Sequence, residues 1–123
     1  MSDCELRLTR RYDAEPALVW KVLTEPEGLG RWLGPAGEVE LSPGGRFEVG
    51  RVEASIRTLE HERLLELDWR YPGEQPSVVR FELTPEGAGT KLVLDHRRVA
   101  EPVGMGYMAR WQVSLRRLDE VLA

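Results

Sequence analysis

The chain has 123 residues, of which 41% are hydrophobic and 31% charged, and its formal net charge is -4. This length is enough for one globular domain with its own core, so we expect a single domain over residues 1–123. The acidic balance argues against nucleic-acid binding, because phosphate recognition needs a clustered basic face. The N-terminus has no signal-peptide pattern, and no apolar run approaches the roughly 18 residues of a membrane span, so we expect a cytoplasmic protein.

The N-terminal third predicts one strand followed by two short helices. Residues 5–12 alternate between apolar and polar side chains, which is typical of a strand with one buried face. Pro16 suits the first position of a helix, which we expect to end at about Leu23. Thr24-Glu25-Pro26-Glu27 has the pattern of a capping box, so we expect the second short helix to begin there.

The middle of the chain predicts short antiparallel strands joined by tight turns. Val39 and Leu41 mark the first of them, and Gly50-Arg51 fits a two-residue hairpin of type II′ after residues 46–49. Apolar residues then alternate along four further segments. The residues expected to point inward are Val52, Ala54, Ile56 and Thr58; Leu65, Leu67, Trp69 and Tyr71; Val79, Phe81 and Leu83; and Leu92, Leu94 and His96.

The last segment predicts one long amphipathic helix that begins near Pro102. Its apolar residues recur at spacings of three and four. They are Tyr107, Met108, Trp111, Leu115, Leu118 and Leu122. The order of elements therefore predicts an α+β fold, in which a curved antiparallel sheet of six to seven strands, with two short helices after its first strand, wraps around a long C-terminal helix.

An ordered set of short motifs runs through nearly the whole chain. The motifs are Val19 to Thr24, Pro26 to Leu29, Trp32 to Gly34, Gly44 to Phe47, Arg63 to Trp69, Phe81 to Pro85, Gly89 to His96, and Trp111 to Leu118. Together they resemble the START-related (SRPBCC) superfamily with the helix-grip fold. Within it, the chain is similar to bacterial proteins related to the C-terminal domain of the heat-shock-protein-90 ATPase activator. It departs from that pattern at Arg110, where the family often has glycine before the tryptophan.

The resemblance implies a cavity between the concave sheet face and the last helix. The residues that would line it are Trp69, Tyr71, Phe81, Leu94, His96, Met105, Met108 and Trp111. An apolar cavity with a few polar groups suits a small hydrophobic or amphipathic ligand, whose binding without catalysis is our leading hypothesis. The same side chains also serve as plain core, because each one buried contributes about 1.5–3 kcal/mol. The sequence leaves open whether the cavity is empty or filled by them.

An enzyme is the first alternative, because the superfamily includes polyketide cyclases and aromatases. By that resemblance, His96, Tyr71 and Tyr107 would be the acid–base candidates. A satisfied core or rim histidine is the simpler interpretation of His96. The chain has no nucleophile motif such as Gly-x-Ser-x-Gly, so the sequence favours a binding protein over an enzyme.

The second alternative is a protein-interaction module, as the resemblance to chaperone activators implies. Leu18, Trp32 and Leu33 would then be exposed apolar residues that mark a partner surface or a dimer contact. We expect a monomer or a homodimer.

Metal and cofactor sites find little support in the sequence. Cys4 is the only cysteine and the two histidines are far apart, so the spacing of a metal site is missing. Gly104-Met105-Gly106 lacks the strand and spacing of a dinucleotide loop. We therefore expect neither a metal nor a cofactor.

Overall fold

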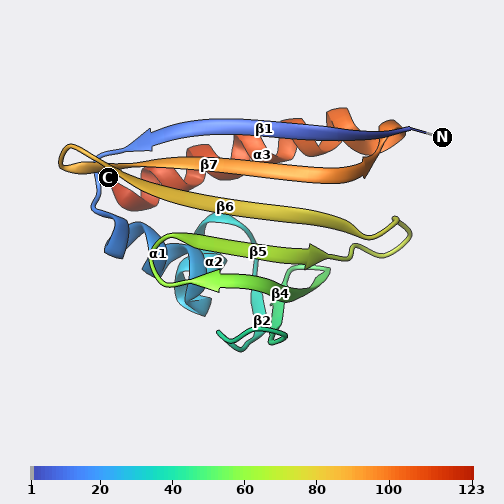
Figure 1. Ribbon diagram of the computed structural model, residues 1–123, viewed down its shortest axis with the longest axis horizontal. Helices are drawn as coiled ribbons and strands as arrows, with labels where there is room; N and C mark the ends of the chain where they lie inside the picture. The colour runs from blue at the N-terminus through green and yellow to red at the C-terminus, as the bar shows by residue number, and fades with distance from the viewer. Residues whose placement is uncertain (1) are drawn as a thin grey trace.

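A computed structural model, which describes residues 2–123, shows one antiparallel sheet with three helices packed on one side (Figure 1). The strands are β1 (Asp3–Tyr12), β2 (Ala36–Val39), β3 (Arg46–Val49), β4 (Val52–Glu60), β5 (Leu64–Trp69), β6 (Ser77–Glu86) and β7 (Gly89–Ala100). The helices are α1 (Pro16–Thr24), α2 (Pro26–Trp32) and α3 (Glu101–Leu122). The predicted α+β helix-grip fold is therefore confirmed.

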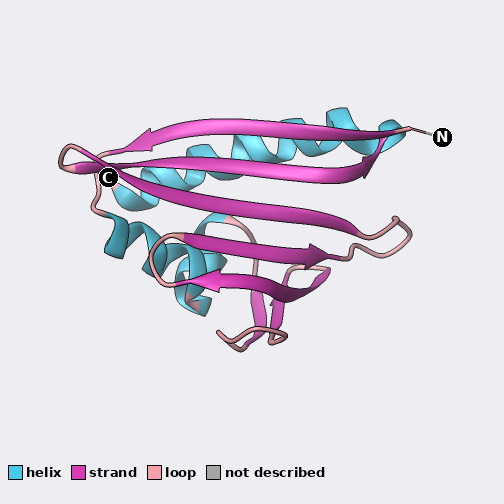
Figure 2. Cartoon of the chain, in the orientation of Figure 1, coloured by secondary structure: helices cyan, strands magenta, loops and turns pink. Residues whose placement is uncertain are grey.

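The seven strands lie in the order β1-β7-β6-β5-β4-β3-β2, so only the pair of β1 with β7 joins segments far apart in the sequence. Figure 2 shows α3 lying behind β1 and β7, while the two short helices lie behind the other half of the sheet. Helix α3 contacts β1, β7 and both short helices. The inner face of the sheet and all three helices thus share one apolar core.

The predicted alternation places the inner face of the sheet correctly along most of its length. Leu65, Leu67 and Trp69 are buried on β5, and His96 is fully buried on β7. Thr58 is an exception to the prediction. The pairing of β4 with β5 shifts register between Ile56 and Thr58, and this bulge turns the Thr58 side chain to the outer face.

The β3–β4 hairpin has the predicted two-residue turn, since Val49 pairs with Val52 across Gly50-Arg51. Gly50 has a φ of +56°, which a side chain at this first central position would oppose. The preceding strand differs from the prediction. It spans Ala36–Val39, and Leu41 lies after it, 45% exposed, in the segment that leads to β3.

The junction between α1 and α2 is held by a different device from the predicted capping box. The Thr24 hydroxyl donates to the Trp20 carbonyl at 2.8 Å, back into α1, and Glu25 precedes α2 without a side-chain cap. Trp32 is also not exposed as the interaction alternative expected. It is 1% exposed, and its Nε1–H donates to the Val22 carbonyl, so α2 folds tightly against α1.

Helix α3 buries the predicted stripe, with Tyr107, Trp111 and Leu115 among its buried residues and Met108 half-buried. The Tyr12 hydroxyl of β1 donates to the Leu115 carbonyl at 3.0 Å, which fixes the helix along the sheet. This alignment sets where the N-terminal half of α3 stands relative to β5.

Candidate functional site

A pocket of about 450 Å³ lies between α3, the end of β5 and the β3–β4 hairpin. Its volume falls within the range of about 300–1,000 Å³ that is usual for small-molecule sites. Its lining consists of Leu33, Val49, Gly50, Arg51, Val52, Trp69, Tyr71, Tyr107, Ala109, Arg110, Trp111, Val113, Ser114 and Arg117. Sheet and helix thus face each other here without filling the space between them.

The pocket walls come from three elements whose local structure aims their side chains inward. Trp69 is the last residue of β5, in phase with the buried leucines of that strand. Tyr107 and Trp111 are four residues apart on α3 and therefore share one face. The tight hairpin places Val49 and Val52 side by side on the opposite wall. The resulting surface is mainly aromatic and aliphatic.

His96 lies beneath this wall and not in it. The ring is fully buried, and the rings of Tyr107 and Trp69 stand edge-on to it at centroid distances of 4.5 and 6.0 Å. Trp111 Nε1–H donates to Nδ1 at 3.0 Å, which leaves the ring proton on Nε2, 2.8 Å from the Ser77 hydroxyl. Burial lowers the pKa of His96 to about 4, so the ring is neutral.

This geometry gives His96 a positioning role for Trp111. Both ring nitrogens are bonded within the protein, and the ring does not line the pocket. A molecule in the pocket would meet the Trp111 indole, not the imidazole. The cyclase-like alternative therefore loses direct contact between its leading acid–base candidate and a ligand in this pocket.

Tyr107 links the pocket wall to the loop between β5 and β6. Its hydroxyl accepts a hydrogen bond from Trp69 Nε1 at 3.3 Å and donates to the Glu74 carboxylate. Burial, followed by the hydrogen bond to Glu74, raises the pKa of Tyr107, so the phenol keeps its proton at neutral pH. These two hydrogen bonds hold the Trp69 and Tyr107 rings in fixed orientations beside the pocket.

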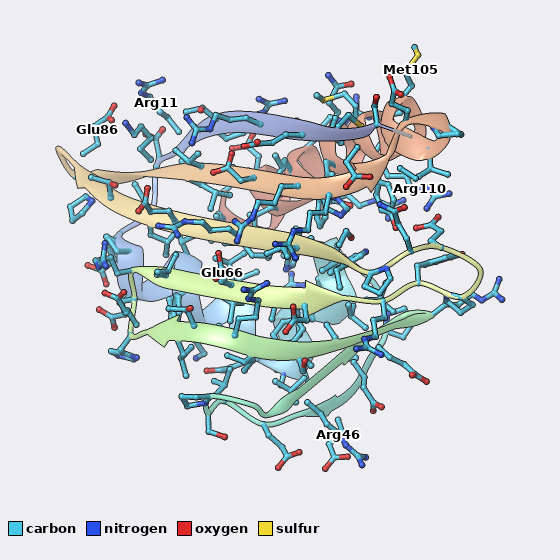
Figure 3. The ribbon with its side chains drawn as sticks, turned by 45° about the vertical axis from the view of Figure 1, so that its right-hand side comes forward. Arg11, Arg46, Glu66, Glu86, Met105 and Arg110 are labelled. Carbon is cyan, nitrogen blue, oxygen red and sulfur yellow. The ribbon has the colours of Figure 1, made fainter. Side chains whose placement is uncertain are left out.

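Three arginines form what we call the basic rim: Arg51, Arg110 and Arg117 line the pocket and are exposed. The guanidinium of Arg51 lies 5.6 Å from the centre of the Tyr71 ring, and that of Arg110 lies 5.7 Å from the same centre. Arg110 also lies 5.5 Å from the Tyr107 ring centre. In Figure 3, Arg110 extends from α3 on the side of the β5–β6 loop. Cation–π contacts of this length hold the two arginines in place.

The structure brings three of the eight predicted ligand-binding residues to the pocket, namely Trp69, Tyr71 and Trp111. The other five lie elsewhere. Phe81, Leu94 and His96 are buried in the core, Met108 is half-buried against it, and Met105 is 88% exposed.

Sequence reasoning missed most of the pocket's remaining lining. Tyr107 was predicted on the same helix face as Trp111 and as an acid–base candidate, but not as part of the ligand-binding set. Ser114 lies three residues after Trp111, so the helical period extended from Trp111 would have placed it on that face. The three arginines carry no such signal, because a single arginine in a turn or helix is usually just solvated.

The described residues show neither a metal-ligand cluster nor a membrane-spanning helix. Within residues 2–123, no group of three or more His, Cys, Asp or Glu side chains is placed to hold a metal ion. None of the three helices described combines the length and apolar character needed to cross a bilayer.

Several solved structures share this architecture. CalU16 from Micromonospora echinospora is 31% identical, with a TM-score of 0.86 over 94% of this chain and 71% of that chain. The MLL2253 protein from Mesorhizobium loti is 21% identical, with a TM-score of 0.87 over 97% and 96% of the two chains. PFC0360w, an HSP90 activator from Plasmodium falciparum, is 20% identical, with a TM-score of 0.82 over 96% and 95%.

The sequence comparisons agree with the structural ones at the level of the family. No curated protein gives a significant match to the chain. Residues 13–123 match the family described as Activator of Hsp90 ATPase homolog 1-like protein, which covers the two short helices, six of the seven strands and α3. The motifs from Val19 to Leu118, the seven-stranded sheet gripping α3 and this match together show that the chain belongs to the Activator of Hsp90 ATPase homolog 1-like family.

Proposed function

We propose that the protein binds a small hydrophobic or amphipathic molecule in the pocket between α3 and the β3–β4 hairpin. The observation that carries the proposal is the pocket of about 450 Å³, walled by Trp69, Trp111, Val49 and Val52. Apolar walls with a few polar groups at one side are what small-molecule sites have in common. The indole rings offer a large contact area to an apolar ligand.

The walls are also preorganised, which favours binding. Both indole N–H groups already have partners, Tyr107 for Trp69 and His96 for Trp111. The rings therefore need not reorient to admit a ligand, and little side-chain freedom is lost on binding. A pocket of this kind presents its rings, not their N–H groups, to the occupant.

A neutral dye tests the proposal directly. We expect N-phenyl-1-naphthylamine to bind saturably, with a rise in its fluorescence, and to shift the indole N–H resonances of Trp69 and Trp111 in a two-dimensional NMR spectrum. Trp20 and Trp32 do not line the pocket and serve as internal controls whose signals stay in place. Failure of the dye to saturate, or equal shifts of all four indoles, would contradict the proposal.

A matched pair of variants on α3 locates the dye. Ser114 is half-buried and lines the pocket, so Ser114→Phe should occupy part of it and weaken dye binding about tenfold or more. Gln112 is exposed and lies outside the lining, so Gln112→Phe should leave the affinity unchanged. Equal affinities of the two variants would place the dye elsewhere on the protein.

A further inference from the structure

We infer that the ligand of this pocket is an organic anion, whose carboxylate, sulfonate or phosphate group is held by the basic rim of Arg51, Arg110 and Arg117 while its apolar body lies against Trp69 and Trp111. The inference rests on the proposed function and adds the chemical class of the ligand. It starts from the distribution of charge around the pocket.

The charge of the pocket lining is opposite to that of the whole protein. The chain has a net charge of -4, yet its fourteen lining residues include three arginines and no aspartate or glutamate. Low-dielectric walls concentrate the field of such charges within a cleft, which raises the local concentration of anions there. A purely hydrophobic ligand would gain nothing from this arrangement.

The arginines of the rim have no carboxylate partner among the described residues. Arg7, Arg57 and Arg97 on the sheet are each paired with an acid within 4 Å, but for residues 2–123 no such pair includes Arg51, Arg110 or Arg117. Other arginines, Arg116 among them, are also unpaired, but they do not line this pocket. The rim thus places three guanidinium groups that are unpaired within the described residues around one cavity.

Arg51 and Arg110 contact the same aromatic ring, and their N–H donors remain available to a ligand. Both groups lie near the ring of Tyr71, at 5.6 and 5.7 Å from its centre. The N–H donors of a guanidinium point outward in its plane and suit bidentate recognition of an anion. At these distances from one ring centre, both cations contribute to the positive potential near Tyr71.

Helix α3 supplies two of the three cations of the basic rim. Arg110 and Arg117 are seven residues apart, which puts them on one face about 10 Å apart along the helix axis. Ser114 lies between them and also lines the pocket. Glu74 accepts from Tyr107 and borders a separate, smaller cavity, and among residues 2–123 it forms no ion pair within 4 Å with a rim arginine.

Two dyes that differ in one group test the inference. 1-Anilinonaphthalene-8-sulfonate has the ring system of N-phenyl-1-naphthylamine plus a sulfonate. We expect the sulfonated dye to bind on the order of tenfold tighter at low salt, and added salt to reduce that difference. The variant Arg51→Gln/Arg110→Gln, which leaves Arg117 in place, should strongly reduce the preference for the sulfonated dye, measured as the ratio of the two dissociation constants in the same variant.

A control variant removes the same number of positive charges away from the pocket. Arg31→Gln/Arg116→Gln removes two exposed arginines that do not line the pocket and should preserve the preference for the sulfonated dye. If both dyes bind equally well to the unmodified protein, or the rim variant keeps the preference, the inference is wrong and the proposed function stands. If neither dye binds, the proposed function itself fails.

A competition arm distinguishes two kinds of natural acid. We expect 1-naphthoate, an aromatic carboxylate, or decanoate, an aliphatic one, to displace the sulfonated dye from the unmodified protein. The more effective competitor identifies the apolar body that the indole walls prefer. Displacement by neither acid would overturn the inference.

Discussion

The two faces of the central sheet satisfy their polar groups in opposite ways. On the inner face, His96 is fully buried and neutral, with Ser77 and Trp111 as its partners. On the outer face, the Glu66 side chain is also nearly buried, at 9% exposed, but its partners are the guanidinium groups of three arginines. Neutral hydrogen bonds suit a surface covered by helices, because an isolated charge there would lose its hydration.

The outer face can hold a charge because it supplies several compensating ones. Glu66 lies 3.2 Å from Arg97 and 3.8 Å from both Arg57 and Arg80, and it accepts a hydrogen bond from Thr58 at 3.3 Å. Figure 3 shows Glu66 in the middle of the sheet, on the face turned away from α3. Each guanidinium is about one-third exposed, so hydration continues to stabilise the cluster. The basic rim follows neither pattern, since it has charge without a partner.

Removing the Trp111 indole, which α3 packs against the inner face of the sheet, should have the largest effect on stability. Trp111 is 2% exposed, so Trp111→Ala should lower the free energy of unfolding by about 3–5 kcal/mol, through lost packing and an unpaired His96 Nδ1. Denaturation in urea measures the change. Val113→Ala, at a residue 38% exposed on the same helix, should cost less than about 1 kcal/mol. Similar losses for the two variants would mean that Trp111 is not part of a packed wall.

Lowering the pH should reduce the folding stability of the protein through protonation of His96. Its pKa is lowered from 6.5 to about 4 by burial, so below pH 6.5 the unfolded chain binds a proton that the folded chain refuses. The stability present above the unfolded pKa is therefore lost as the pH falls towards 4, by about 2 kcal/mol near pH 5.

Replacing the imidazole isolates this effect. His96→Gln keeps an acceptor and a donor at this position but does not titrate. Urea denaturation at neutral pH and near pH 5 should show a smaller acid-induced loss for the variant, by about the same 2 kcal/mol, because the carboxylates contribute equally to both proteins. Identical pH dependences would show that the imidazole is protonated without cost in the folded state.

Substitutions on the outer face of the sheet should lower the free energy of unfolding least. Glu66→Gln removes the common partner of three arginines, and we expect a loss of roughly 1–2 kcal/mol, below the 3–5 kcal/mol of a fully buried pair because the guanidinium groups remain hydrated. Glu86→Gln breaks the more exposed pair with Arg11 at the end of the sheet and should change stability by less than about 0.5 kcal/mol. Equal effects would show that Glu66 gains nothing from its position.

The inner face was largely predictable from the sequence, since alternation and helical spacing report burial directly. Leu65, Leu67 and His96 turned inward as predicted. Thr58 did not, because a bulge changes the phase of a strand without any marked residue in the sequence. Trp32 was predicted as exposed because its burial depends on α2 folding back onto α1.

The candidate site was less predictable, for a physical reason. Phe81 and Leu94 were correctly placed on the inner face, but the pocket lies further along the sheet, where the hairpin and α3 stand apart. Which inward residues meet open space depends on the separation of elements, and periodicity contains no information about it. The rim arginines come from a turn and a helix that only the fold brings together.

The two-residue turn at Gly50-Arg51 has a consequence for how such a protein could change its preference. It sets one wall of the entrance and carries one of the rim cations, yet it joins only β3 and β4, near the edge of the sheet far from α3's anchor at Tyr12. Lengthening this turn by a few residues would widen the opening and withdraw Arg51 while leaving the remaining frame intact. Selectivity and foldability can therefore vary independently in this architecture.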